Sequence, residues 1–79
     1  MTDGKLLLRL IEESGMPKTV VAERSGFSRD RLYSIIDGSE CRASEMEGLT
    51  KTLHLTSAVS KQLFFAKEVA EQTTSEVNL

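Results

Sequence analysis

The chain has 79 residues, 39% of them hydrophobic, with one Pro, one Cys and no Trp. This length leaves room for one small core, so we expect a single domain. A formal net charge of −2 is the main objection to DNA binding, because Lys and Arg contacts with phosphate supply most of the affinity of DNA-binding proteins. The distribution of charge therefore matters more than its total. The lone Cys41 cannot form an internal disulfide, and no apolar run has the length of a membrane span or the shape of a secretory signal. These features predict a reducing, cytoplasmic setting and no membrane partner.

The first two predicted helices lie within residues 4–25. In the first, expected over residues 4–14, the residues that recur at helical spacing are Leu6, Leu7, Leu10 and Ile11. Asp3 is a candidate cap at its start, and Gly15 ends it. Pro17 fits the first turn of the second helix, expected over residues 17–25, because its missing amide proton is not required there.

Residues 18–38 read KTVVAERSGFSRDRLYSIIDG, two short helical stretches joined by a turn at Gly26. A chain leaving a helix commonly adopts a left-handed conformation there, which glycine tolerates best. Ser28 offers a hydroxyl to cap a third helix, expected over residues 28–37, which Gly38 terminates. The small Ala22 lets the two helices cross closely. This pattern predicts a helix-turn-helix, a motif that points towards DNA.

Two further helices complete an all-α chain. Ser44 and Glu47 have the spacing of a capping box and predict that a fourth helix begins there. Thr56 is a candidate cap for a fifth helix over residues 57–71. We therefore expect a helix-turn-helix domain over residues 1–71. Residues 72–79 lack a periodic apolar face and are expected to form a flexible tail.

The charges are unevenly distributed along the chain. Residues 17–42 contain five basic and four acidic residues, whereas residues 43–79 contain three basic and five acidic ones. The excess acid therefore lies away from the predicted motif, which fits a DNA-binding surface and equally a solvating coat of surface charge.

The segments VAERSGFS, RLYSIIDG and MEGLTKTLHL resemble the lambda-repressor-like, Cro-type (XRE) helix-turn-helix family over about residues 5–70. The matching positions are Val21, Ala22, Gly26, Ser28, Leu32, Ile35 and Gly38. The resemblance implies a compact five-helix domain in which helices 2 and 3 form the motif. It further implies a sequence-specific transcriptional regulator, a repressor, that binds double-stranded DNA and often acts as a dimer on a two-fold-related operator.

By the same resemblance, the exposed start of the third helix enters the major groove. The candidate base-contacting residues are Arg29, Asp30, Arg31 and Tyr33. Each Arg can donate a pair of hydrogen bonds to guanine, and Asp30 can accept one from cytosine. The candidate backbone contacts are Lys18, Thr19, Ser28, Ser34, Ser39 and Arg42. Purely structural roles stay open: Ser28 as a cap, Asp30 at the positive helix terminus, and the Tyr33 ring against the scaffold.

The last helix carries more apolar surface than one small domain is expected to bury. The candidate dimerisation residues are Val59, Leu63, Phe64, Phe65 and Ala66. A symmetric contact through them would place two recognition helices on a palindromic site. The alternative is that the same residues complete the core of one domain.

No catalytic set is visible, so we expect neither an enzyme nor a cofactor or metal. His54 and Cys41 are the only residues of their types and are separated by the start of a helix. The competing function is a protein-interaction module that keeps the helix-turn-helix scaffold and binds another regulator. The acidic pI of about 5.3 favours it, as do Val20 and Ile36, which stand where many relatives have polar residues.

Overall fold

The computed structural model describes residues 2–65, and this part of the chain is all-helical, as predicted. Five helices follow one another without an intervening strand in these residues: α1 (Gly4–Ser14), α2 (Lys18–Ser25), α3 (Arg29–Ile36), α4 (Ala43–Leu53) and α5 (Ser57–Phe64). The fifth helix is shorter than the predicted range of 57–71, because α5 ends at Phe64 and Phe65 is no longer helical. Residues 66–71 and the predicted tail lie outside the described residues.

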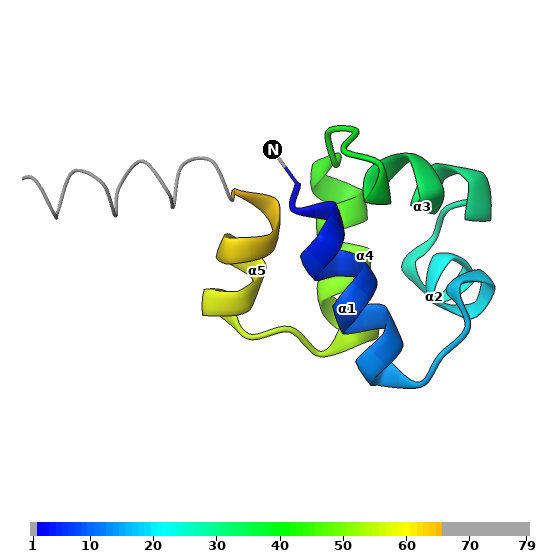
Figure 1. The fold of residues 1–79 in the computed structure, drawn as a ribbon, viewed down its shortest axis with the longest axis horizontal. Coiled ribbons are helices and arrows are strands. Elements are labelled where there is room, and N and C mark those ends of the chain that lie inside the picture. The colour runs from blue at the N-terminus through cyan, green and yellow to red at the C-terminus, as the bar shows by residue number, and fades with distance from the viewer. Residues whose placement is uncertain (1, 66–79) are drawn as a thin grey trace, which may run out of the picture.

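The helices α1 and α4 occupy the middle of the molecule, with α5 on one side and α2 and α3 on the other (Figure 1). α4 packs against α1, α2 and α5, while α3 packs against α1 and α2. A backbone hydrogen bond of 2.8 Å from the N–H of Asp3 to the carbonyl of Leu63 ties the start of α1 to α5. The start of α3 thus lies at the periphery, on a framework formed by the other helices.

The core is formed by buried residues from all five helices and the loop before α4. It contains Leu7, Ile11, Val21, Ala22, Leu32, Ile35, Cys41, Leu49, Leu63 and Phe64. Each helix buries residues three, four or one position apart, as one face of a helix requires. α3 contributes Leu32 and Ile35, both 0% exposed, so its opposite side faces solvent.

Three of the predicted caps are confirmed. Asp3, Ser28 and Thr56 each precede a helix and accept a hydrogen bond of 3.1–3.2 Å from the backbone N–H three residues further on. Such a bond satisfies an amide that the first helical turn leaves without a partner. These caps fix where α1, α3 and α5 begin.

The fourth helix begins one residue before the predicted start at Ser44, and its cap pair lies two residues before the predicted pair of Ser44 and Glu47. α4 begins at Ala43, and Glu45 rather than Glu47 occupies its third position, where it accepts a 2.8 Å hydrogen bond from the N–H of Arg42. Ser44 is exposed within the first turn. This register turns Glu45 inward, on the same face as Leu49. Pro17 likewise precedes α2 rather than lying in its first turn.

Two glycines fit the α2–turn–α3 segment to the framework. Gly26 has φ of +93° in the turn between α2 and α3, a conformation that side chains resist. Gly48 of α4 faces the end of α2, and a Cβ there would overlap the carbonyl oxygen of Ser25. The hydroxyl of Ser25 also lies 3.1 Å from that of Thr52. α2 therefore approaches α4 closely enough that only glycine fits at position 48.

Candidate nucleic-acid interface

The start of α3 presents three exposed polar side chains to solvent: Arg29, Asp30 and Tyr33. We refer to these three residues as the exposed face of α3. The turn at Gly26 and the cap at Ser28 set where the helix begins, while Leu32 and Ile35 anchor its other side in the core. The face therefore projects from a helix whose inward side is fully packed.

Arg29 and Tyr33 lie one helical turn apart and contact each other. The guanidinium carbon of Arg29 lies 5.9 Å from the centre of the Tyr33 ring, within the range of a cation–π interaction. Tyr33 is 42% exposed, one of two large hydrophobic residues with substantial exposure among residues 2–65. The arrangement holds a positive charge and an aromatic ring together at an accessible helix surface.

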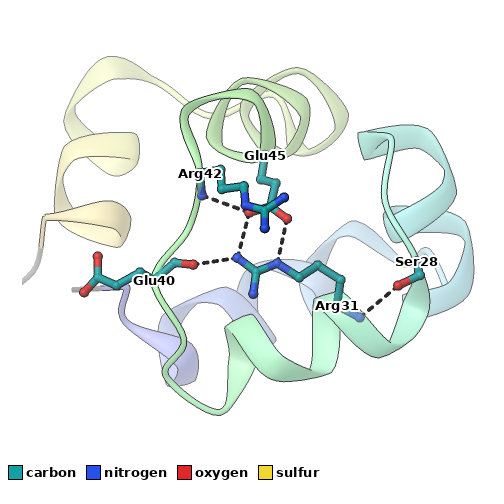
Figure 2. A network of polar contacts seen from close by, with 5 residues as sticks. All are labelled: Ser28, Arg31, Glu40, Arg42 and Glu45. Atoms are coloured by element: carbon teal, nitrogen blue, oxygen red, sulfur yellow. Dashed lines mark hydrogen bonds and ion pairs between the residues drawn. The ribbon is translucent and has the colours of Figure 1, made fainter.

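Arg31 does not belong to this face. Its Nε donates to Glu45 Oε2 at 2.7 Å and its Nη2 to Glu45 Oε1 at 2.9 Å, while Nη2 also donates to the Glu40 carbonyl at 2.7 Å (Figure 2). The Arg31 side chain is only 28% exposed. The expectation that Arg31 projects into solvent like Arg29 is therefore wrong, because two of its three guanidinium nitrogens are bonded within the chain.

Glu45 is the centre of this polar network. Its side chain is 8% exposed and accepts hydrogen bonds from Arg31 and from the backbone N–H of Arg42. The hydrogen bond from Arg31, helped by the one from Arg42, outweighs burial and lowers the pKa of Glu45 from 4.5 to about 2. The same pairing raises the pKa of Arg31. Both groups are therefore charged at neutral pH.

Cys41 lies beside this network and is buried at 7% exposure. Burial, together with the negative charge of Glu45, raises the pKa of its thiol from 9.0 to about 11. The thiol is consequently protonated at neutral pH, and its reactivity is low. Cys41 therefore acts as a small core residue in the loop before α4.

The predicted backbone-contacting residues differ in exposure. Thr19, Ser28 and Arg42 are exposed, whereas Lys18, Ser34 and Ser39 are partly buried. The hydroxyl of Ser28 already accepts the cap hydrogen bond. Arg42 lies immediately before α4 and is tied by its backbone to Glu45, the partner of Arg31. The network therefore links Arg42 to α3, a connection that the sequence did not reveal.

Two of the predicted dimerisation residues are not available on the surface. Leu63 and Phe64 are 0% and 3% exposed because they belong to the core of this chain. Val59 is partly buried, Phe65 is 44% exposed, and Ala66 lies outside the described residues. For Leu63 and Phe64 the alternative interpretation, completion of the monomer core, is correct.

Phe65 borders a groove of about 430 Å³ between α4 and α5. Met46 and Phe64 contribute to its apolar lining, and Lys51 and Lys61 to its polar edge. Lys51 forms an exposed ion pair with Glu47 at 3.0 Å. The groove thus lies on α4 and α5 and shares no residue with the exposed face of α3.

The involvement of Glu45 was missed from the sequence, although a signal for it exists. Arg31 precedes the buried Ile35 by four residues, and Glu45 precedes the buried Leu49 by four. Residues four apart share one face of a helix, so both charges are directed towards the core. Two opposite charges directed inward from adjacent helices are expected to pair, because an unpaired buried charge is costly.

Other chemistries have little support among residues 2–65. No group of three His, Cys, Asp or Glu side chains in this range could hold a metal ion. Within the same range, no helix combines the length and apolarity needed to cross a bilayer. His54 is exposed and adopts a left-handed conformation directly after α4. The chain has no significant match among protein-family models, curated proteins or solved structures.

Proposed function

We propose that the chain is a sequence-specific DNA-binding transcriptional regulator of the lambda-repressor-like helix-turn-helix type. In this proposal α2 and α3 form the motif, and α3 enters the major groove. The observation that carries it is the exposed face of α3: Arg29, Asp30 and Tyr33 project from a short helix that begins at a glycine turn and a serine cap. Among these three residues, the exposed aromatic ring beside an arginine favours a binding face over a merely solvated one.

The proposed base contacts come from this face. Arg29 donates to O6 and N7 of a guanine, the pairing for which a guanidinium is best suited. Asp30 accepts from a cytosine N4, and Tyr33 supports Arg29 through its ring while its edge is open to a base. Arg31 is not assigned a base contact, because Glu45 and Glu40 occupy its guanidinium.

The proposed phosphate contacts surround the face. Lys18 and Thr19 open α2, and the exposed Arg42 precedes α4. Ser34 and Ser39 are partly buried and joined by a 3.0 Å backbone hydrogen bond from the N–H of Ser39 to the carbonyl of Ser34. Such contacts orient a protein on the duplex without reading its sequence. With few free cations, the affinity is expected to be modest and to fall with rising salt.

Selection of bound sequences from a random duplex library, at low and at physiological salt, tests this function. We expect enrichment of one short sequence containing a guanine that depends on Arg29. Failure to enrich any sequence at either salt concentration would contradict DNA recognition. It would favour the alternative function, a helix-turn-helix-derived module that binds another regulator.

We propose in addition that two copies associate through the edge of the groove between α4 and α5. Phe65 is the support for this, because it is 44% exposed beside an apolar groove. Sedimentation equilibrium of the purified chain should show a dimer, and Phe65→Ser should shift it to monomer. Tyr33→Ser is the matched control, since it removes an equally exposed ring from another surface. A monomeric wild-type chain at working concentration would contradict the association.

A further inference from the structure

One carboxylate joins three segments of the chain beside the proposed interface. Glu45, in the first turn of α4, accepts two hydrogen bonds from Arg31 in the first turn of α3. It also accepts the N–H of Arg42, and Arg31 donates in turn to the carbonyl of Glu40 in the loop between the two helices. Figure 2 shows the guanidinium held between Glu40 and Glu45. The starts of both helices and the connecting loop are thereby fixed to one another.

The first turn of α3 depends on this contact more than the rest of the helix does. The fully buried residues Leu32 and Ile35 anchor the helix from its middle onward. Within residues 29–31, the Arg29 and Asp30 side chains are exposed, and Arg31 is the one that is partly buried. The backbone of Arg31 is held by the Ser28 cap at 3.1 Å, and its side chain by Glu45. Both the backbone and the side chain of Arg31 are thus held in place.

The paired geometry controls orientation as well as distance. Two parallel hydrogen bonds between a planar guanidinium and a carboxylate allow little rotation of one group against the other. Because Arg31 lies on the side of α3 opposite Arg29 and Tyr33, any rotation of the first turn would displace the exposed face. A recognition surface must be held within about 0.5 Å of its productive geometry to be effective.

We infer that Arg31 and Glu45 are positioning residues for the exposed face of α3: they act on DNA recognition through the placement of Arg29 and Tyr33. This inference rests on the proposed function for its effect on DNA. Its structural half, that the pair fixes the first turn of α3, can be measured without DNA.

The chain offers a specific reporter for that structural half. Tyr33 is the only Tyr of the chain, and the chain contains no Trp. The intrinsic fluorescence of the protein therefore comes from α3 alone. We expect Glu45→Gln to lower the anisotropy of Tyr33 and to speed hydrogen exchange of the Arg31 amide well below the melting temperature. Glu47→Gln is the matched control, since Glu47 pairs with Lys51 on the exposed side of the same helix. Arg31→Lys serves as a second variant that keeps the charge but loses the paired geometry.

A double-mutant cycle tests the functional half. In the wild-type background, Glu45→Gln should weaken binding to the selected duplex roughly tenfold. In an Arg29→Ala background the same change should cost little, because Arg29, the main base-contacting group that it misplaces, is already absent. A merely structural role would lower affinity equally in both backgrounds.

The structural part and the functional part of the inference can be contradicted independently. Unchanged Tyr33 anisotropy and unchanged hydrogen exchange of the residue 31 amide, in both Glu45→Gln and Arg31→Lys, would overturn the positioning role. An additive cycle would overturn its effect on recognition. If the wild-type chain selects no DNA sequence, the proposed function fails, and the fluorescence and exchange measurements still decide whether the pair fixes the first turn.

Discussion

Arg29 and Arg31 are two residues apart on the same short helix, yet their surroundings are opposite. Arg29 is exposed and lies over the Tyr33 ring. Arg31 is directed inward, where Glu45 and the Glu40 carbonyl take up its donors. Two positions along an α-helix amount to slightly more than half a turn, which accounts for the difference. On such a helix, position relative to the buried residues, rather than residue type, decides which arginine is available to a partner.

The largest expected difference between the two sides of α3 is in stability. Leu32→Ala, on the inward side, should lower the free energy of unfolding by about 2–5 kcal/mol, because it empties a fully buried site. Tyr33→Ala, at the next residue on the outward side, should change it by no more than about 0.5 kcal/mol. Urea unfolding followed by circular dichroism measures both. Similar losses for the two variants would contradict the assigned faces.

The close approach of Gly48 in α4 to the end of α2 should give the next largest effect on stability. Gly48→Ala places a Cβ against the backbone carbonyl of Ser25, so we expect a loss of about 1–3 kcal/mol despite the better helix propensity of Ala. Ser44→Ala, an exposed position of the same helix, should cause no loss from steric overlap. Thermal melts of the two variants make the comparison. A Gly48→Ala variant as stable as the wild type would show that α2 and α4 lie further apart.

The Arg31–Glu45 pair should make a smaller, pH-dependent contribution. Glu45→Gln should lower the melting temperature by roughly 5–10 °C at pH 7, whereas Glu47→Gln, in an exposed pair, should have little effect. The pKa of Glu45 is lowered on folding from 4.5 to about 2, so its stabilisation is complete above about pH 4.5 and is lost as pH falls towards 2.

Melting temperatures measured between pH 7 and pH 2 therefore check the sign of this effect. The difference in melting temperature between the wild type and Glu45→Gln should narrow as pH falls. Protonation of Glu45 in the wild type removes the negative charge that Gln also lacks. A gap that stays constant over this range would mean that Glu45 contributes through packing alone.

Local signals in the sequence were sufficient for the helices and three caps. Asp3, Ser28 and Thr56 each accept a hydrogen bond from the residue three positions further along the chain, so a short stretch of sequence contains all the relevant groups. The Ser44 and Glu47 capping box failed because tertiary burial decided the register: beginning α4 at Ala43 directs Glu45 towards Arg31. Because Arg is not a preferred N-cap residue, the sequence alone favoured the Ser44 start, and only the burial of Glu45 accounts for the earlier one.

Long-range contacts explain the remaining errors. The pairing of Arg31 with Glu45 spans 14 residues and depends on how α3 meets α4. Likewise, Leu63 and Phe64 fill the core because α5 packs on α1 and α4, which their apolar character alone does not indicate. The sequence identified which residues were apolar or charged, but the arrangement of helices determined which of them remained accessible.

We propose that Arg29, on the exposed face of α3, reads DNA while the framework formed by the other helices holds it in place. Titration of Arg29→Ala with the selected duplex and with a scrambled one tests it most directly. Arg9→Ala is the matched control, because it removes an equally basic, exposed side chain from α1. We predict that Arg29→Ala loses about ten- to a hundredfold in affinity for the selected duplex alone, at unchanged melting temperature. Equal affinities of Arg29→Ala and Arg9→Ala for both duplexes would contradict the account.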